Sequence, residues 1–210
     1  MHTDTFHLYS YYCSSCCQRI IIAAHLKGIP LEFTYIDLGA KEHKTDEYKQ
    51  YNPSGSVPTL VVTSQDGEKT IIRQSMTILE YFEERFPDTT PLFPPALRDR
   101  VWRVKSIRGQ LDDQVDFAKQ VFTDGFQAYE RLLTEHAGEE DLSFSFGGSV
   151  SMADVVLVPA VDQALMYRMD LDLVPNVKRI YHALKALEPF KAADWRDQGD
   201  TPEKFRNQES

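Results

Sequence analysis

The residues best placed for chemistry are the serines and cysteines near the N-terminus, in the run Cys13-Ser14-Ser15-Cys16. This run lies between a short apolar and aromatic segment and the Ile- and Ala-rich segment 19–26, so it predicts a loop that joins a strand to the start of a helix. Free backbone N–H groups and the helix dipole at such a place favour anions, thiolates included. We therefore expect Ser14 or Ser15 to donate a hydrogen bond to a bound thiolate, with Cys16 beside it on the first helical turn.

The same loop has two other interpretations. A serine in front of a helix is most often only a cap. Cys13-x-x-Cys16 also has the spacing of a dithiol that performs thiol-disulfide exchange. Together with Cys17 these are all the cysteines of the chain, and their crowding into one short window is typical of local thiol chemistry in a reducing compartment, not of a disulfide framework.

Two further segments carry groups that can hold a peptide-like ligand. In Ser56-Val57-Pro58 the proline follows a turn and precedes an apolar segment, which makes it a candidate for a cis bond. A cis bond would expose the backbone N–H and C=O of Val57 for pairing with an extended ligand, whereas the alternative is a proline that simply begins a strand. Gln74 and Ser75 open the next helical segment, where a serine can cap and backbone amides can bind a carboxylate.

The elements that must position these residues alternate at first between strand and helix. Strands are predicted for 6–10, 31–38, 57–62 and 69–72, helices for 19–26 and 74–85, and a short helix within the polar stretch 41–51. The order is β-α-β-α-β-β-α, which begins with a βαβ unit and ends with a hairpin followed by a helix.

A change of architecture is expected at the proline-rich stretch 86–95, which no regular element can cross. Beyond it only helical patterns are found, at 101–122, 125–133, 152–166 and 177–187, and the tail 197–210 is polar and expected to be irregular. We expect an α/β domain over residues 1–86 and an all-helical domain over residues 96–210.

Composition excludes some partners. The net charge of the 210-residue chain is -9, which argues against nucleic acid because binding to a phosphate backbone needs clustered Lys and Arg. No apolar run approaches the roughly 20 residues that span a bilayer, and the first residues lack the pattern of a signal peptide. A cytoplasmic protein with no membrane or nucleic-acid partner and no metal is expected.

Taken together, the motifs resemble the zeta class of the glutathione transferases. The run Tyr9–Cys16 with Arg19 is similar to the S-S-C signature of that class. Three segments resemble the family's glutathione site: Asn52-Pro53, Val57-Pro58-Thr59-Leu60, and Gln74-Ser75 ahead of Ile78–Tyr81. Farther along, Ser151-Met152-Ala153-Asp154 resembles the family's C-domain capping box, and Asp200-Thr201-Pro202 resembles the zeta-class tail.

The resemblance implies a thioredoxin-like N-terminal domain, an all-helical C-terminal domain and a homodimer. It also implies glutathione as cofactor and the cis-trans isomerisation of maleylacetoacetate, a small acidic electrophile, as the activity. The implied roles are these: Ser14 or Ser15 with Cys16 surround the glutathione sulfur, Ser56, Val57 and Pro58 bind the cysteinyl backbone, Gln74 and Ser75 hold the γ-glutamyl end, and His43 faces the glycine carboxylate.

Three departures from the family pattern bear on the substrate. Cys13 stands where the family has a basic residue, His43 stands where a Gln is expected, and the segment Arg98–Leu133, which corresponds to the helices that wall the substrate pocket, is shorter than in the family. Glutathione conjugation or dehalogenation of small electrophiles, thiol-disulfide exchange through Cys13-x-x-Cys16, and a non-enzymatic binding module are the alternatives.

Overall fold

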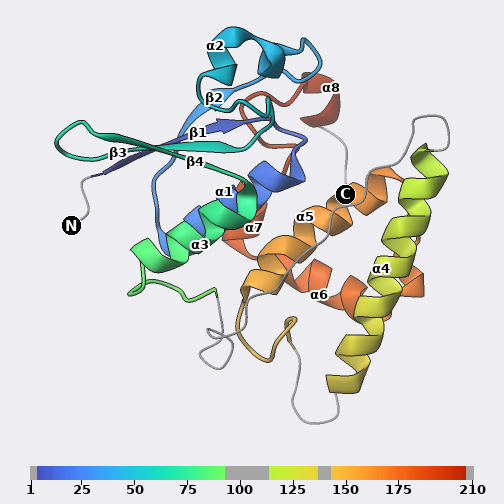
Figure 1. Cartoon of the computed structure of the whole chain (residues 1–210). Coiled ribbons are helices and arrows are strands. Elements are labelled where there is room, and N and C mark those ends of the chain that lie inside the picture. Colours follow the sequence, from blue (N-terminus) through green and yellow to red (C-terminus); the bar gives the residue numbers. More distant parts are fainter. Residues whose placement is uncertain (1–3, 93–113, 137–142, 207–210) are drawn as a thin grey trace. The chain divides into compact units, whose positions relative to one another are not determined.

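The computed structural model describes residues 4–92, 114–136 and 143–206 (Figure 1). Its contacts divide the chain into two compact units, Met1–Thr90 with Glu188–Ser210, and Pro91–Leu187. The sequence-based division at 86 and 96 differs in one respect, because it placed the last segment with the second unit. That segment follows the helices along the chain but packs against the first helix, so chain order alone did not indicate its place.

The first unit contains the predicted β-α-β-α-β-β-α order around a four-stranded sheet, as expected of a thioredoxin-like domain (Figure 1). Its strands are β1 (Thr5–Ser10), β2 (Glu32–Tyr35), β3 (Thr59–Thr63) and β4 (Lys69–Arg73). Its helices are α1 (Ser15–Lys27), α2 (Asp46–Lys49), which follows the 3-10 turn η1 (Glu42–Lys44), and α3 (Ser75–Arg85). The strand order is β2-β1-β3-β4, with β1 parallel to β2 and the other pairs antiparallel.

The register of the strands places the C-terminal ends of β1, β2 and β4 and the N-terminal end of β3 at the same edge of the sheet. Ser10, the last residue of β1, pairs with Tyr35 at the end of β2. Thr59, the first residue of β3, pairs with Tyr9 on one side and with Arg73, the last residue of β4, on the other. The segments that follow β1, precede β3 and follow β4 therefore start from neighbouring points.

An apolar core makes this edge rigid. Leu8, Ile20, Leu60, Ile78 and Phe82 have no exposed surface, and they come from β1, α1, β3 and α3. Helix α1 ends at Gly28, whose φ of 66° is a left-handed conformation that glycine adopts without strain. Because α1 begins where β1 ends and is buried along most of its length, its N-terminus has little freedom to move relative to the sheet.

A buried lysine joins the far end of α1 to α3. The side chain of Lys27 has no exposed surface, and its Nζ lies 2.8 Å from the carboxylate of Glu83. The same nitrogen donates to the carbonyl oxygens of Phe86 and Thr90 at 3.3 and 3.1 Å. Since Phe86 directly follows α3, the cation satisfies carbonyl groups at the C-terminus of that helix.

The second unit is helical in the part of it that the structure describes. It contains α4 (Gln114–His136), α5 (Met152–Met166), the 3-10 turn η4 (Leu171–Leu173) and α6 (Pro175–Lys185). The prediction of 152–166 is confirmed, and so is the capping box in which Ser151 and Asp154 bond each other's backbone at the start of α5. Helix α6 is capped from α4, because the N–H groups of Asn176 and Val177 donate to the carboxylate of Glu130 at 2.9 and 3.0 Å.

One helix prediction in this unit is wrong. Separate helices were predicted on either side of residues 123–124, but α4 runs through Gly125 without a break. A single glycine inside a helix costs only about 1 kcal/mol, and the apolar pattern on both sides outweighs it. Residues 101–113 of the predicted first helix lie outside the described residues, so the short length expected for 98–133 stays a prediction.

The C-terminal segment is more regular than predicted. It contains α7 (Glu188–Ala192), which packs on α1, and α8 (Glu203–Arg206), so the expectation of an irregular tail over 197–210 is wrong for the part that is described. Side-chain hydrogen bonds to the backbone hold the stretch between these helices. Among the described residues, no helix combines the length and hydrophobicity needed to cross a membrane.

We expect Lys27→Met to lower the free energy of unfolding by about 3 kcal/mol, because it leaves the carboxylate of Glu83 and two backbone carbonyls without their buried partner. Urea denaturation followed by circular dichroism measures the loss. Lys178→Met is the matched control, since Lys178 pairs with Asp172 at the surface and such pairs contribute little. Equal stability of the two variants would contradict a structural role for the buried lysine.

Candidate active site

The N-terminus of α1 presents Ser14. Ser14 is the N-cap residue of the helix, and its Oγ accepts a hydrogen bond from the backbone N–H of Cys17 at 3.3 Å. The backbone N–H of Ser14 in turn bonds the carbonyl of Tyr11 at 3.0 Å, which closes a tight turn between β1 and α1. The capping interpretation is therefore correct, but it leaves the hydroxyl proton of Ser14 able to bond an anion at the helix N-terminus.

The next residues differ in accessibility. Ser15 is the first residue of α1 and is buried, whereas Cys16 is half-buried. Cys17 is 1% exposed, and burial raises the pKa of its thiol to about 11 even though the hydroxyls of Ser14 and Ser10 lower it. Of the two serines, Ser14 has the more accessible hydroxyl in front of the helix.

The dithiol interpretation fits this geometry poorly. A side chain at the N-cap position lies closest to the free N–H groups of a helix, and here that side chain belongs to Ser14. Cys13 stands one residue earlier, and burial raises the pKa of its thiol instead of lowering it. All the cysteines of the chain lie within the described residues, and they are in the thiol form.

The loop before β3 presents the backbone of Val57. The predicted cis bond is present between Val57 and Pro58. Val57 is half-buried, and within the part of the chain that the structure describes its N–H and C=O make no hydrogen bond. A donor and an acceptor on one residue, both without partners, match the needs of an extended peptide-like ligand that pairs as an added strand.

A buried polar network fixes the peptide group next to Val57. The side-chain amide of Asn52 donates to the carbonyl of Ser56 at 2.8 Å and to Oγ1 of Thr59 at 3.0 Å. The hydroxyl of Tyr48 donates to the same carbonyl at 2.7 Å. Asn52, Tyr48 and Thr59 are 1%, 3% and 0% exposed, so these bonds are sheltered from water and leave the loop little freedom.

The start of α3 is an open helix N-terminus. Gln74 lies directly after β4 with φ 73° and ψ 125°, a region that non-glycine residues rarely occupy, and its side chain makes no capping hydrogen bond. Ser75 follows as the first helical residue and is buried at 7% exposure. Arg73 holds the strand end by donating from Nε to the carbonyl of Tyr51 at 2.6 Å. Backbone N–H groups with no cap are well suited to a carboxylate.

His43 lies in η1, beside the loop that carries Val57. A Cβ on Gly55 would stand 2.6 Å from the carbonyl oxygen of His43, and Nζ of Lys44 donates to the carbonyl of Gly55 at 3.3 Å. Nδ1 of His43 is buried, and no described residue lies within hydrogen-bond reach of it. Burial and the neighbouring Lys44 hold the pKa of His43 below its usual value, so the ring is neutral at about pH 7 and can donate one hydrogen bond.

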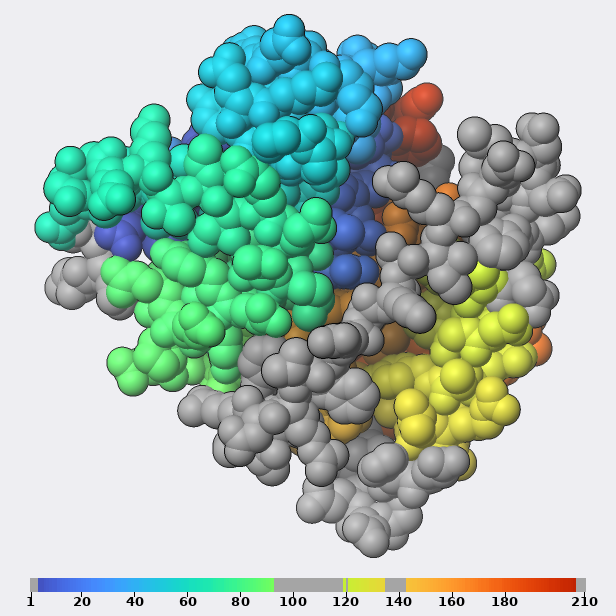
Figure 2. All heavy atoms as spheres, viewed as in Figure 1, coloured from blue at the N-terminus to red at the C-terminus, as the bar shows by residue number. Residues whose placement is uncertain are grey.

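These residues gather at one edge of the first unit. Figure 2 shows blue atoms of the N-terminal segment beside the cyan atoms of the 40–58 region and the green atoms of α3. Strand pairing through Thr59 brings together the segments that carry Ser14, Val57 and Gln74, and the close packing of Gly55 adds His43. Sequence reasoning did not assign a role to Tyr48 or Thr59, because a tyrosine and a threonine with ordinary neighbours give no signal that they will meet.

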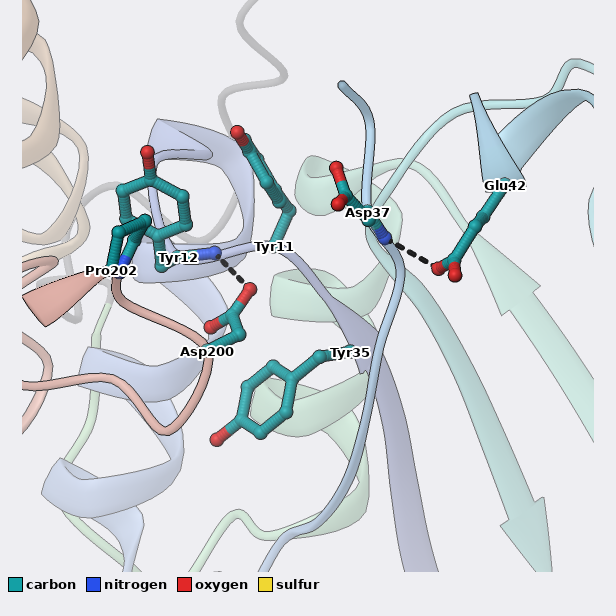
Figure 3. Close-up of a pocket in the computed structure, with 7 residues that line it drawn as sticks. All are labelled: Tyr11, Tyr12, Tyr35, Asp37, Glu42, Asp200 and Pro202. Carbon is teal, nitrogen blue, oxygen red and sulfur yellow. Dashed lines mark hydrogen bonds between the residues drawn. The ribbon is translucent and has the colours of Figure 1, made fainter. Parts of the chain in front are cut away.

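A pocket lies next to this edge but holds none of the predicted site residues (Figure 3). Its volume is about 290 Å³, and it is lined by Tyr11, Tyr12, Tyr35, Asp37, Glu42, Asp200 and Pro202. The lining has carboxylates and no basic side chain, so it would repel an acidic substrate. It contains Tyr11 and Tyr12, the first residues of the turn that leads to Ser14.

We expect native Cys13 to react slowly with iodoacetamide at about pH 7 and Cys17 not at all, because burial raises the pKa of both thiols and Cys17 is also inaccessible. Since each thiol ionises only as the pH rises through its pKa, the Cys13 rate should keep rising beyond about pH 9. Mass spectrometry of peptides from the timed reaction gives both rates. Fast modification of Cys13 at about pH 6 would instead favour a dithiol enzyme.

The amino-acid sequence is similar to those of known proteins over nearly its whole length. Residues 13–85 match the family of the glutathione S-transferase N-terminal domain. The chain is 35% identical to maleylacetoacetate isomerase maiA of Aspergillus fumigatus, with 95% of this chain and 94% of that protein covered. It is 37% identical to maleylacetoacetate isomerase of Mus musculus, with 95% and 96% covered.

Solved structures of maleylacetoacetate isomerases also have a fold similar to this one. The fold is similar to that of maleylacetoacetate isomerase from Anaeromyxobacter dehalogenans with glutathione bound in the active site, with a TM-score of 0.77, 30% identity, and 96% of this chain and 100% of that chain covered. A second structure of that protein, with a TM-score of 0.76, 28% identity and the same coverage, holds dicarboxyethyl glutathione and citrate in the active site.

Proposed function

Because the chain belongs to the zeta class of the glutathione transferase superfamily, we propose that it is a glutathione-dependent isomerase that converts maleylacetoacetate to its trans isomer. The observation that carries this proposal is the position of the Ser14 hydroxyl. It stands at the N-terminus of α1, on the same edge of the sheet as the unpaired backbone groups of Val57 and the open N-terminus of α3.

The residues present fit glutathione. The N–H and C=O of Val57 are free to pair with the backbone of a cysteinyl residue, and the open amides after Gln74, with the hydroxyl of Ser75, suit the carboxylate of a γ-glutamyl group. The neutral ring of His43 has one N–H, which suits the carboxylate at the glycine end. Each of these assignments pairs a group of the protein with a complementary group of the tripeptide.

When bound, glutathione supplies a thiolate that adds reversibly to the cis double bond, which allows rotation before the thiolate leaves again. The protein has to keep that sulfur ionised at neutral pH. Ser14 does so by donating a hydrogen bond from its hydroxyl to the thiolate, and the dipole of α1 adds about 0.3–1 kcal/mol in favour of the anion. Ser15 is buried behind it, and Cys16 occupies the first turn as a half-exposed neighbour.

The acidic character of the substrate is part of the proposal. A related isomerase binds dicarboxyethyl glutathione and citrate, and another, from Methylobacterium, binds malonate with glutathione. The pocket beside Tyr12 is unsuitable for such a ligand because Asp37, Glu42 and Asp200 line it. We therefore expect the substrate to bind outside that pocket. A homodimer and a cytoplasmic location complete the proposal, as in the family resemblance.

Conjugation or dehalogenation of small electrophiles is the second candidate, because it uses the same activated thiolate with a different partner. Cys13, in place of a basic residue, removes one cation that an acidic substrate can use, and this favours testing neutral electrophiles as well. A non-enzymatic binding module would not require a hydroxyl in front of α1.

We expect Ser14→Ala to lower the rate of glutathione-dependent isomerisation about tenfold to a hundredfold at about pH 7, whereas Ser15→Ala has little effect. A hydrogen bond to a charged group contributes about 1.5–3 kcal/mol, which corresponds to a rise of about one to two units in the pKa of the bound thiol. The absorbance change on adding maleylacetoacetate, with and without glutathione, measures the rate, and ultraviolet titration of the thiolate measures the pKa.

Two control variants separate this effect from others. Ser14→Asp keeps a helix-capping oxygen but has no proton to donate, so it should recover the stability that alanine loses without recovering activity. Cys13→Ala should leave isomerisation unchanged and would abolish a dithiol reaction. Full activity in Ser14→Ala would refute the role of Ser14, and tight glutathione binding without isomerisation would redirect the search to conjugation and dehalogenation.

A further inference from the structure

The turn that carries Ser14 is tied to the C-terminal segment. In the turn Tyr11–Ser14, the bond from the N–H of Ser14 to the carbonyl of Tyr11 leaves the N–H of Tyr12 pointing outward. Oδ2 of Asp200 accepts that N–H at 2.9 Å, although 188 positions separate the two residues in sequence (Figure 3).

Aromatic packing reinforces the same contact. The ring of Tyr12 stacks on Phe205 with centroids 6.2 Å apart and lies 6.3 Å from Trp195. Trp195 and Phe205 also meet edge to face at 6.0 Å. The turn is therefore held by its backbone and by its side chain, and both contacts come from the last stretch of the chain.

The segment that presents Asp200 is itself well fixed. Oγ1 of Thr201 donates to the carbonyl of Trp195 at 2.6 Å, and Arg206 donates to the carbonyls of Gln198 and Thr201 at 3.1 and 2.9 Å. Gly199 lies against the end of β2, because a Cβ at that position would stand 2.7 Å from the hydroxyl of Tyr35. These contacts all lie within the first unit, which includes Glu188–Ser210.

The environment of the Asp200 carboxylate is unfavourable for a residue with only a structural role. Its Oδ1 is buried and has no hydrogen-bond partner among the described residues, and burial raises the pKa of the carboxyl group. A buried carboxylate oxygen without a hydrogen bond lowers the free energy of unfolding, so Asp200 is not the residue that stability alone would favour here. The bond that Asp200 makes to Tyr12 is two residues from Ser14.

We propose that Asp200 is a positioning residue for Ser14: by holding the N–H of Tyr12, it fixes the turn that aims the Ser14 hydroxyl at the glutathione sulfur. The inference rests on the proposed function of Ser14. A donor to a thiolate is effective only over a narrow range of distance and angle, and a displacement of about 1 Å can lower a rate a hundredfold. The C-terminal segment thus contributes, through Asp200, to the pKa of the bound glutathione thiol.

The test compares Asp200→Ala with Asp200→Asn in the full-length chain. Alanine removes the acceptor, whereas the amide oxygen of asparagine can still accept the N–H of Tyr12. We expect Asp200→Ala to lower kcat about tenfold and to raise the pKa of the bound glutathione thiol, with a smaller change in KM for glutathione. Asp200→Asn should stay within about threefold of the parent protein in kcat. Hydrogen exchange of the peptide that spans residues 11–17, without ligand, should be faster only in the alanine variant.

Two controls distinguish positioning from general loss of structure. Lys27→Met destabilises the same unit at the far end of α1, so it should leave the thiol pKa unchanged at temperatures where it is folded. Asp197→Ala changes an exposed carboxylate of the same segment and should match the parent protein. A thiol pKa that rises equally in Lys27→Met, or an asparagine variant as impaired as the alanine variant, would overturn the proposal.

The failure of this inference can be told apart from the failure of the proposed function. If the parent protein binds glutathione but does not isomerise maleylacetoacetate, the isomerase assignment fails, and the thiol titration still decides the role of Asp200. If Asp200→Ala retains the parent's thiol pKa and its exchange rate over residues 11–17, the positioning role fails, whatever the reaction.

Discussion

The position at which β3 begins determines the arrangement of the whole candidate site. Thr59 pairs with Tyr9 on β1 and with Arg73 on β4, so one residue sets the register of the strands that lead to Ser14 and to Gln74. Its side chain also accepts from Asn52 and meets the hydroxyl of Tyr48, which fixes the loop before it. A slip of one residue at this point would turn the apolar face of β3 away from the core, and it would separate the site segments at the same time.

The second constraint is the helix frame of α1, which decides between the chemistries that the same run of residues permits. Whatever occupies the N-cap lies at the positive end of the dipole, next to N–H groups that have no partner within the helix. The chain places Ser14 there, with Cys13 outside the helix and Cys17 inside the core. The spacing of Cys13-x-x-Cys16 is that of a dithiol site. Which of these side chains lies at the helix N-terminus depends on where the helix begins, and α1 begins at Ser15 with Ser14 as its N-cap.

Much of the first unit could be predicted because its signals are local. Periodicity indicated the strands and helices between Thr5 and Arg85, and the turn before Pro58 indicated the cis bond. The break predicted near Gly125 was wrong because a weak local preference yielded to the packing of a long apolar face. The roles of Tyr48 and Asp200 could not be predicted, since each depends on a partner that is adjacent only after folding.

The contribution of the C-terminal segment shows why fold and chemistry are hard to separate in this protein. A polar tail with few apolar residues gave no periodic signal, yet Trp195 and Phe205 pack against the ring of Tyr12, and Asp200 bonds its backbone. The turn between β1 and α1 is closed by one backbone bond, from the N–H of Ser14 to the carbonyl of Tyr11. The bond from the N–H of Tyr12 to Asp200 adds a constraint on its outer side. Residues far apart in the sequence therefore fix this turn, so the candidate site is complete only when the segment 195–205 has folded against it.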